Sequence, residues 1–147
     1  MAKSTRKLRP QPWDWPHPRV LLELPEGDGN GDRIAALRGA GYSVAVCPGP
    51  RDGSHCPLAG DDGCAVADEA DIVVSSLGLH RPVARETLAA LRKRLPELPV
   101  LVEAPMDEAQ RWPELVRDGE RLEPGLSAPE LVARVDSALA REWTARA

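Results

Sequence analysis

The 147-residue sequence contains no phenylalanine and a single tyrosine. A folded core must therefore be built from aliphatic side chains. With 42% apolar and 29% charged residues, the composition is that of a globular chain and not of a disordered one. No apolar run approaches the roughly 20 residues of a membrane-spanning helix, and the amino-terminal residues lack the apolar segment of a secretory signal. We therefore expect one domain of ordinary size, in the cytoplasm and without a membrane anchor.

The charge is distributed unevenly along the chain. Residues 1–17 are rich in proline and carry four basic residues against Asp14, a net charge of +3, whereas the whole chain carries −4 and the remainder therefore −7. An acidic body repels phosphates and disfavours a broad nucleic-acid surface. We expect residues 1–17 to be a disordered or loosely pinned basic tail and residues 18–147 to form the domain, with no direct contact to nucleic acid.

Strand and helix patterns alternate along the domain. Apolar segments predict strands at Arg19–Leu24, Tyr42–Cys47, Asp71–Leu77, Pro99–Ala104 and, weakly, Glu120–Glu123. Helical patterns predict helices at Asp32–Gly41, Cys64–Ala70, Val83–Leu95, 106–118 and from Ser127 onward, where Ser127 and Glu130 form a capping box. This alternation predicts an α/β fold, a three-layer sandwich whose five-stranded parallel sheet has the order 2-1-3-4-5.

Three stretches of the chain carry a family resemblance: RVLLELPEG, ADIVVSSLGLHRPVARETLAALRKRLPELPVLVEAP and RLEPGLSAPELVARVDSAL. In order, spacing and strand character, the chain from Arg19 to Leu139 resembles the receiver domain of response regulators (the CheY-like, flavodoxin-like family). That resemblance implies a regulatory domain of two-component signalling.

The residues by which a receiver is phosphorylated are missing. In the family, an acidic pair after the first strand binds Mg²⁺, an Asp that ends the third strand accepts the phosphoryl group, a Thr or Ser ends the fourth strand, and a Lys precedes a Pro after the fifth. The matching positions here hold Leu24 and Pro25, Ser76, Ala104 and Glu123. Aspartyl phosphorylation needs a carboxylate nucleophile, a divalent cation and a cationic side chain. The resemblance therefore implies a degenerate pseudo-receiver, and no catalytic residue is carried over from the family.

The three cysteines of the chain gather in one Gly- and Pro-rich loop. Cys47, Cys56 and Cys64 follow the pattern C-x8-C-x7-C, with His55 beside Cys56, where a receiver has its second helix. Three thiolates and an imidazole can bind Zn²⁺, and three thiolates can hold an iron–sulfur cluster. The close C-x2-C pairs of structural zinc sites are absent. Metal ligands, redox-active thiols and inert thiols therefore stay open as interpretations.

Two further segments suggest small-molecule chemistry. The loop PEGDGNGD (residues 25–32) has the placement of a phosphate cradle, but it has no P-loop lysine and its acids would repel phosphate. Ser76 and His80 suggest a hydrolase, yet no G-x-S-x-G elbow and no orienting acid accompany them. We expect His80 to be an exposed loop residue.

Three functions follow from these patterns. The first is a phosphorylation-independent, receiver-like regulatory protein without enzyme activity, which contacts a protein partner or a second copy through the helix at 106–118 and the final helix, with Trp112 and Trp143. The second is a metal-binding (zinc or iron–sulfur) or redox-sensing protein that uses Cys47, Cys56, Cys64 and His55. The third is a nucleotide-binding protein or small enzyme.

Overall fold

The computed structural model describes residues 17–25, 30–49, 56–57 and 63–146, with side chains up to Arg141. Within them, five parallel strands form one sheet in the order β2-β1-β3-β4-β5, which confirms the predicted order. The strands are β1 (Arg19–Glu23), β2 (Ser43–Cys47), β3 (Ile72–Ser75), β4 (Val100–Glu103) and β5 (Arg121–Leu122). The predicted basic tail lies outside the described residues, apart from His17.

In the described segments, five helices connect the strands or follow them, as the alternating pattern predicted. They are α2 (Gly31–Gly39), α3 (Ala65–Glu69), α4 (Pro82–Arg94), α5 (Met106–Arg111) and α6 (Ala128–Arg146). Where a receiver has its second helix, α3 has only five residues. Gly41 follows α2 with a φ of +97°, a conformation that favours glycine, and this explains why the helix ends there. None of the helices in the described part of the chain is long and apolar enough to cross a membrane.

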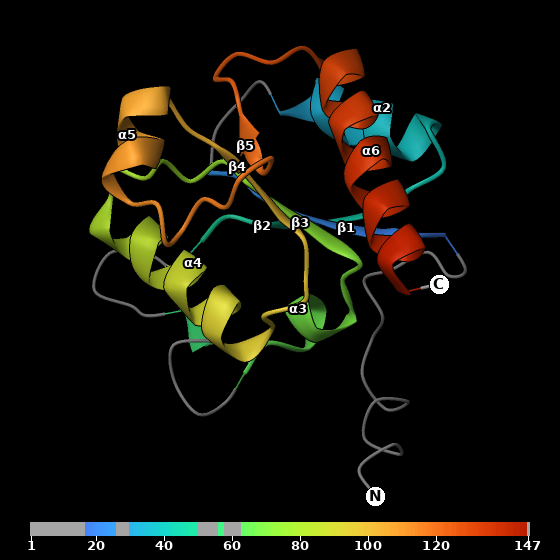
Figure 1. The fold of residues 1–147 in the computed structure, drawn as a ribbon. Coiled ribbons are helices and arrows are strands. Elements are labelled where there is room, and N and C mark those ends of the chain that lie inside the picture. Colours follow the sequence, from blue (N-terminus) through green and yellow to red (C-terminus); the bar gives the residue numbers. More distant parts are fainter. Residues whose placement is uncertain (1–16, 26–29, 50–55, 58–62, 147) are drawn as a thin grey trace, which may run out of the picture.

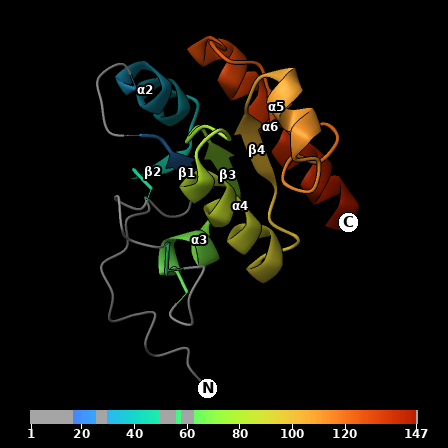
Figure 2. The same ribbon diagram turned by 90° about the vertical axis from the view of Figure 1, so that its left-hand side faces the viewer.

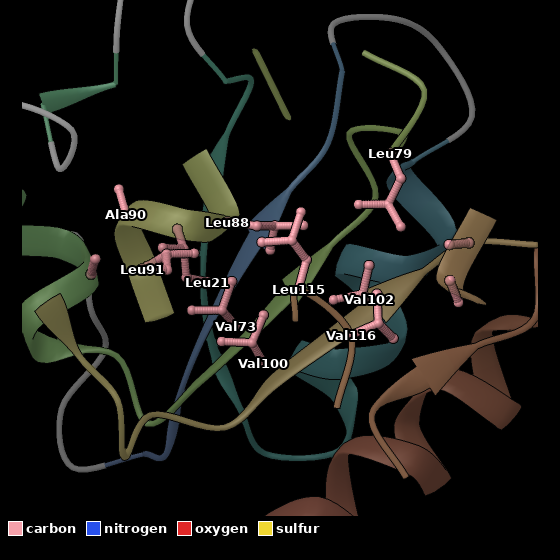
Figure 3. Packing of buried hydrophobic residues seen from close by; sticks show 13 residues of the cluster. Leu21, Val73, Leu79, Leu88, Ala90, Leu91, Val100, Val102, Leu115 and Val116 are labelled. Carbon is pink, nitrogen blue, oxygen red and sulfur yellow. The ribbon is translucent and has the colours of Figure 1, made fainter. Parts of the chain in front are cut away.

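The sheet is covered on both faces (Figure 1). Helices α2 and α6 lie on one face, and α3, α4 and α5 lie on the other; α3 and α4 are side by side in both views (Figures 1 and 2). Successive strand residues point to opposite faces, so Leu22 and Val74 enter a core beneath α2 and α6, whereas Leu21 and Val73 enter a core beneath α4. Figure 3 shows this second cluster, which we call the α4-side core. The first is called the α6-side core.

The capping box and most of the apolar stripe predicted for the final helix are confirmed. The hydroxyl of Ser127 accepts a hydrogen bond of 3.3 Å from the backbone N–H of Glu130 and donates one of 2.7 Å to its carboxylate. Leu131, Val135 and Leu139 are buried in the α6-side core. The helix thereby covers one face of the sheet.

Shortening Leu101 tests whether the central strands hold the fold together. Leu101 of β4 is fully buried in the α6-side core, and Leu101→Ala should lower the free energy of unfolding by about 2–5 kcal/mol because it leaves a cavity. Val46→Ala is the control, because Val46 lies on the edge strand and is 46% exposed. Urea unfolding of the variants gives both values. Equal losses would contradict the assignment of the core.

Candidate functional site

The carboxyl ends of the parallel strands meet at one edge of the sheet, where α/β proteins bind ligands. The positions that the resemblance assigns to the metal-binding acids lie just beyond β1. Leu24 is buried in the α6-side core, and its N–H donates a 3.0 Å hydrogen bond to the carbonyl oxygen of Cys47. Pro25 is exposed. Neither side chain can bind a cation, so the family's acidic pair is missing at these two positions; the residues that follow, 26–29, lie outside the described part.

An arginine from α2 lies at this edge instead. Nη2 of Arg33 is 2.6 Å from Oε2 of Glu103, the last residue of β4, and Nη1 donates a longer bond of 3.4 Å to Oε1. The same Nη1 lies 3.4 Å from Oγ of Ser76, the position of the family's phosphoacceptor. Nη2 also donates to the carbonyl oxygen of Leu126, 3.3 Å away, in the β5–α6 connection.

The Arg33–Glu103 pair connects four parts of the fold: α2, the residue after β3, the end of β4 and the start of α6. Both side chains are mostly shielded, with exposed fractions of 15% and 17%. A two-pronged guanidinium–carboxylate contact of this kind is among the stronger polar interactions in proteins. The two charges therefore compensate each other, and the guanidinium of Arg33 lies within 3.4 Å of the Ser76 hydroxyl oxygen.

The other family positions carry no cation at the edge. Ala104 is buried, and its carbonyl oxygen accepts a 3.0 Å hydrogen bond from Nη1 of Arg121. Glu123, at the position of the family's lysine, is exposed and paired with the guanidinium of Arg121, whose hydrogen bond and charge lower the pKa of its carboxyl group. A carboxylate there would repel a phosphoryl group.

The α4-side face of the same edge holds a second carboxylate. Glu23, the last residue of β1, is 2% exposed and is the register partner of Ser75 in β3. Burial raises the pKa of Glu23 to about 7, and a hydrogen bond from Ser75 offsets only part of that rise. Oε1 of Glu23 is buried and has no hydrogen-bond partner among the described residues. Such a group favours the protonated carboxyl.

All three cysteines contact the α4-side core as partly buried thiols. Burial raises the pKa of Cys47, and the charges of Glu23, Cys56 and Cys64 raise it further, while a backbone hydrogen bond at Gly49 opposes the shift. The three thiols thus share one neighbourhood, as their clustering predicted. However, no three His, Cys, Asp or Glu residues of the described segments form a group able to hold a metal ion. The zinc or iron–sulfur prediction finds no support there, and His55 lies outside the described residues.

The hydrolase pair is not assembled in the structure. The hydroxyl of Ser76 contacts Arg33, whereas Nδ1 of His80 lies 3.8 Å from a carboxylate oxygen of Glu108. The side chain of His80 is 71% exposed, as expected for a loop histidine. In the proposed phosphate cradle, residues 26–29 lie outside the described part. Asn30 caps α2 without a side-chain hydrogen bond, and Asp32 lies in the first turn.

Comparisons with known proteins agree with this architecture. No protein-family model matches the chain, and no curated protein matches it. Solved structures do match. A response regulator receiver protein from Sinorhizobium medicae has a TM-score of 0.63 at 18% identity, covering 88% of this chain and 99% of that one. The chain has the receiver fold.

Two further solved structures support the same conclusion. A CheY-like receiver domain from Methanospirillum hungatei has a TM-score of 0.65 at 13% identity over 87% of this chain and 98% of its own. An orphan response regulator of H. pylori has a TM-score of 0.61 at 20% identity over 83% of this chain and 96% of its own. At these identities the likeness establishes the fold.

Sequence reasoning missed three charged residues of this receiver fold. Glu23 and Glu103 each interrupt an apolar strand near its end, and an isolated acid in a buried parallel strand is a signal that such a residue has a special environment. Arg33 has no comparable signal, because one arginine on a short polar helix is common. Its partner Glu103 lies 70 residues further along the chain, so only the fold reveals the pair.

The buried carboxyl of Glu23 makes stability depend on pH. Its pKa is about 7 in the folded chain against 4.5 in the unfolded one, so the folded state holds the proton more tightly. Its contribution to stability is complete below about pH 4.5, falls as the pH rises to about 7, and changes little above that. The total is roughly 3 kcal/mol.

Glu23→Gln removes this titration and keeps the shape of the side chain. The difference in unfolding free energy between Glu23→Gln and the parent should shift in favour of the variant from pH 5 to pH 7.5. Urea titrations at several pH values measure it, and the subtraction cancels the other titrating groups. A difference that stays constant with pH would show that Glu23 is not the buried acid described above.

Proposed function

We propose that the chain is a phosphorylation-independent, receiver-like regulatory module that acts through protein–protein contact and not as an enzyme. The receiver fold supports a regulatory role of this kind. The observation that carries the proposal is the position of Arg33, whose guanidinium lies above Ser76 and is held by Glu103.

The chemistry of phosphoryl transfer explains why this position matters. A receiver's reaction needs a carboxylate to attack phosphorus and a divalent cation to neutralise the phosphoryl oxygens. Here the attacking position holds a hydroxyl. The charge of the Arg33 guanidinium is compensated by Glu103, so that carboxylate is already paired and is not free to bind a divalent cation. A phosphoryl dianion would therefore meet no uncompensated cation among these residues, and Glu123 adds repulsion.

The region around α4, α5 and β5 is held in a fixed arrangement that suits a contact surface. Nη2 of Arg92 on α4 lies 2.9 Å from Oε1 of Glu120 and donates a 2.9 Å hydrogen bond to the carbonyl oxygen of Leu115. Glu120 also accepts a 3.2 Å hydrogen bond from the N–H of Val100. These contacts connect α4, β4 and the segment before β5 without any phosphorylation.

Of the two tryptophans in the predicted contact surface, only Trp112 has a side chain in the described part of the structure. The ring of Trp112 packs on the α4-side core, and the guanidinium carbon atoms of Arg85 and Arg111 lie 4.4 and 5.3 Å from its centroid. Trp112 thus contacts α4 through Arg85, directly after the end of α5. Trp143 is on α6, and its side chain lies outside the described part. We propose that α5 and α6 contact a protein partner or a second copy, with Trp143 as the anchor.

A direct test uses beryllofluoride with Mg²⁺, which mimics a phosphoryl group on an aspartate, and acetyl phosphate as a phosphoryl donor. The chain should gain no phosphoryl mass by intact mass spectrometry. Its melting temperature and its molar mass by light scattering should be the same with and without the reagents, because its contacts do not depend on phosphorylation. A phosphorylatable receiver domain run in parallel serves as the positive control.

Either of two results would overturn the proposal. One is a mass increase of one phosphoryl group on this chain. The other is a rise in melting temperature with beryllofluoride and Mg²⁺ together that neither reagent gives alone.

A further inference from the structure

Cys56 and Cys64 lie in two short segments, Cys56–Pro57 and Gly63–Cys64, that are joined by a backbone hydrogen bond. We call these two segments the neck. The N–H of Gly63 donates a 3.2 Å hydrogen bond to the carbonyl oxygen of Pro57. Cys56 precedes Pro57 and Cys64 follows Gly63, so one cysteine flanks each end of this hydrogen bond. The residues next to a backbone hydrogen bond between two segments lie close together. A disulfide needs a Cα separation of about 4.4–6.8 Å, which such a neck can provide.

The neck is packed against the rest of the domain. Both thiols contact the α4-side core and are half-buried, so neither is sealed from solvent. The carbonyl oxygen of Cys64 accepts a 3.0 Å hydrogen bond from the N–H of Asp68, which fixes Cys64 at the start of α3. On the other side, a Cβ atom on Gly63 would lie 3.1 Å from Nη2 of Arg94 on α4. The segments that carry the two cysteines are therefore packed against the α4-side core.

Cys47 belongs to the same cluster, but it lies at the end of a strand and not beside the Pro57–Gly63 hydrogen bond. It ends β2, and its register partner is Glu23, whose buried Oε1 has no hydrogen-bond partner within the described segments. Burial raises the pKa of the Cys47 thiol, and the Glu23 charge adds to the rise. Since the thiolate is the reacting form, this raised pKa disfavours Cys47 as a nucleophile at neutral pH. The cluster thus offers two cysteines beside the Pro57–Gly63 hydrogen bond and a third, Cys47, whose thiol has a raised pKa.

We propose that Cys56 and Cys64 form an oxidation site, which a peroxide converts into an intramolecular disulfide. One thiolate attacks a peroxide oxygen and cleaves the O–O bond, which gives a sulfenic acid and, with hydrogen peroxide as the oxidant, one water. The second thiol attacks that sulfur, forms the S–S bond and releases the sulfenic oxygen as a second water. The two thiols lose two electrons in total and the peroxide gains them. The proposal does not depend on the regulatory function proposed above.

The consequence is a covalent closure of the neck. The bond would join the segment after β2 to the first residue before α3, in the place where a receiver has a full helix. Oxidation would thereby restrict the region around α3 without touching the Arg33–Glu103 pair. Thiol oxidants are the class of signal to which this surface would respond.

The experiment exposes the reduced full chain to hydrogen peroxide in steps and counts thiols with a chromogenic disulfide, followed by alkylation and peptide mapping. The parent should lose two of three thiols, decrease in mass by two hydrogens as a monomer, and recover fully with dithiothreitol. Cys47→Ser is the matched control from the same cluster, and it should still lose two thiols. Cys56→Ser and Cys64→Ser should form no intramolecular disulfide.

Three results would overturn the proposal: a parent that keeps all three thiols at peroxide levels that oxidise a reference dithiol, a mapped disulfide that includes Cys47, or cross-linked dimers as the sole product. Circular dichroism of each serine variant shows whether it is folded. Should a serine variant fail to fold, Cys56→Ala and Cys64→Ala take its place in the same assay.

Discussion

The ion pair between Arg33 and Glu103 is the interaction on which the carboxyl edge of the sheet depends. It joins α2 to β4 and reaches Ser76 and the β5–α6 connection as well. Because both side chains are largely shielded from solvent, removing one partner would leave the other charge poorly compensated. The pair places a guanidinium, compensated by Glu103, beside Ser76, the position that the resemblance assigns to the phosphoacceptor. The chain has the receiver fold, and the proposal of a phosphorylation-independent module rests on this arrangement at the carboxyl edge.

The sequence was sufficient to predict the fold because its signals are local. Apolar runs such as the one in β3, helix ends such as Gly41 and the capping box at Ser127 each act within a few residues. Their alternation leaves few topologies for a parallel sheet. The main differences are at element ends: β3 was predicted to reach Leu77 but ends at Ser75. The N–H of Ser76 still donates a 2.8 Å hydrogen bond to the carbonyl oxygen of Glu23, and Leu77 is buried, so the apolar pattern runs past the last residue of the strand.

The site was predicted less well because its contacts are not local. The resemblance identified positions, Leu24 and Ser76 among them, where the family's phosphorylation residues are missing. It did not predict that Arg33 lies beside Ser76. The clustering of the three cysteines was visible from their spacing, whereas the absence of a metal-binding group among the described residues depends on side-chain directions. Glu23 shows the same limit, since its raised pKa results from burial between β2 and β3, which no short pattern reveals.

A double-mutant cycle on Arg33→Met and Glu103→Gln tests the central claim most directly. Unfolding free energies of the parent, both single variants and the double variant give the coupling between the two side chains. Our account predicts a favourable coupling of roughly 1–3 kcal/mol between the two side chains. The stability losses of the two single variants should then sum to more than the loss of the double variant. Additive effects within about 0.5 kcal/mol would contradict it, because they would mean that the pair does not hold the edge together.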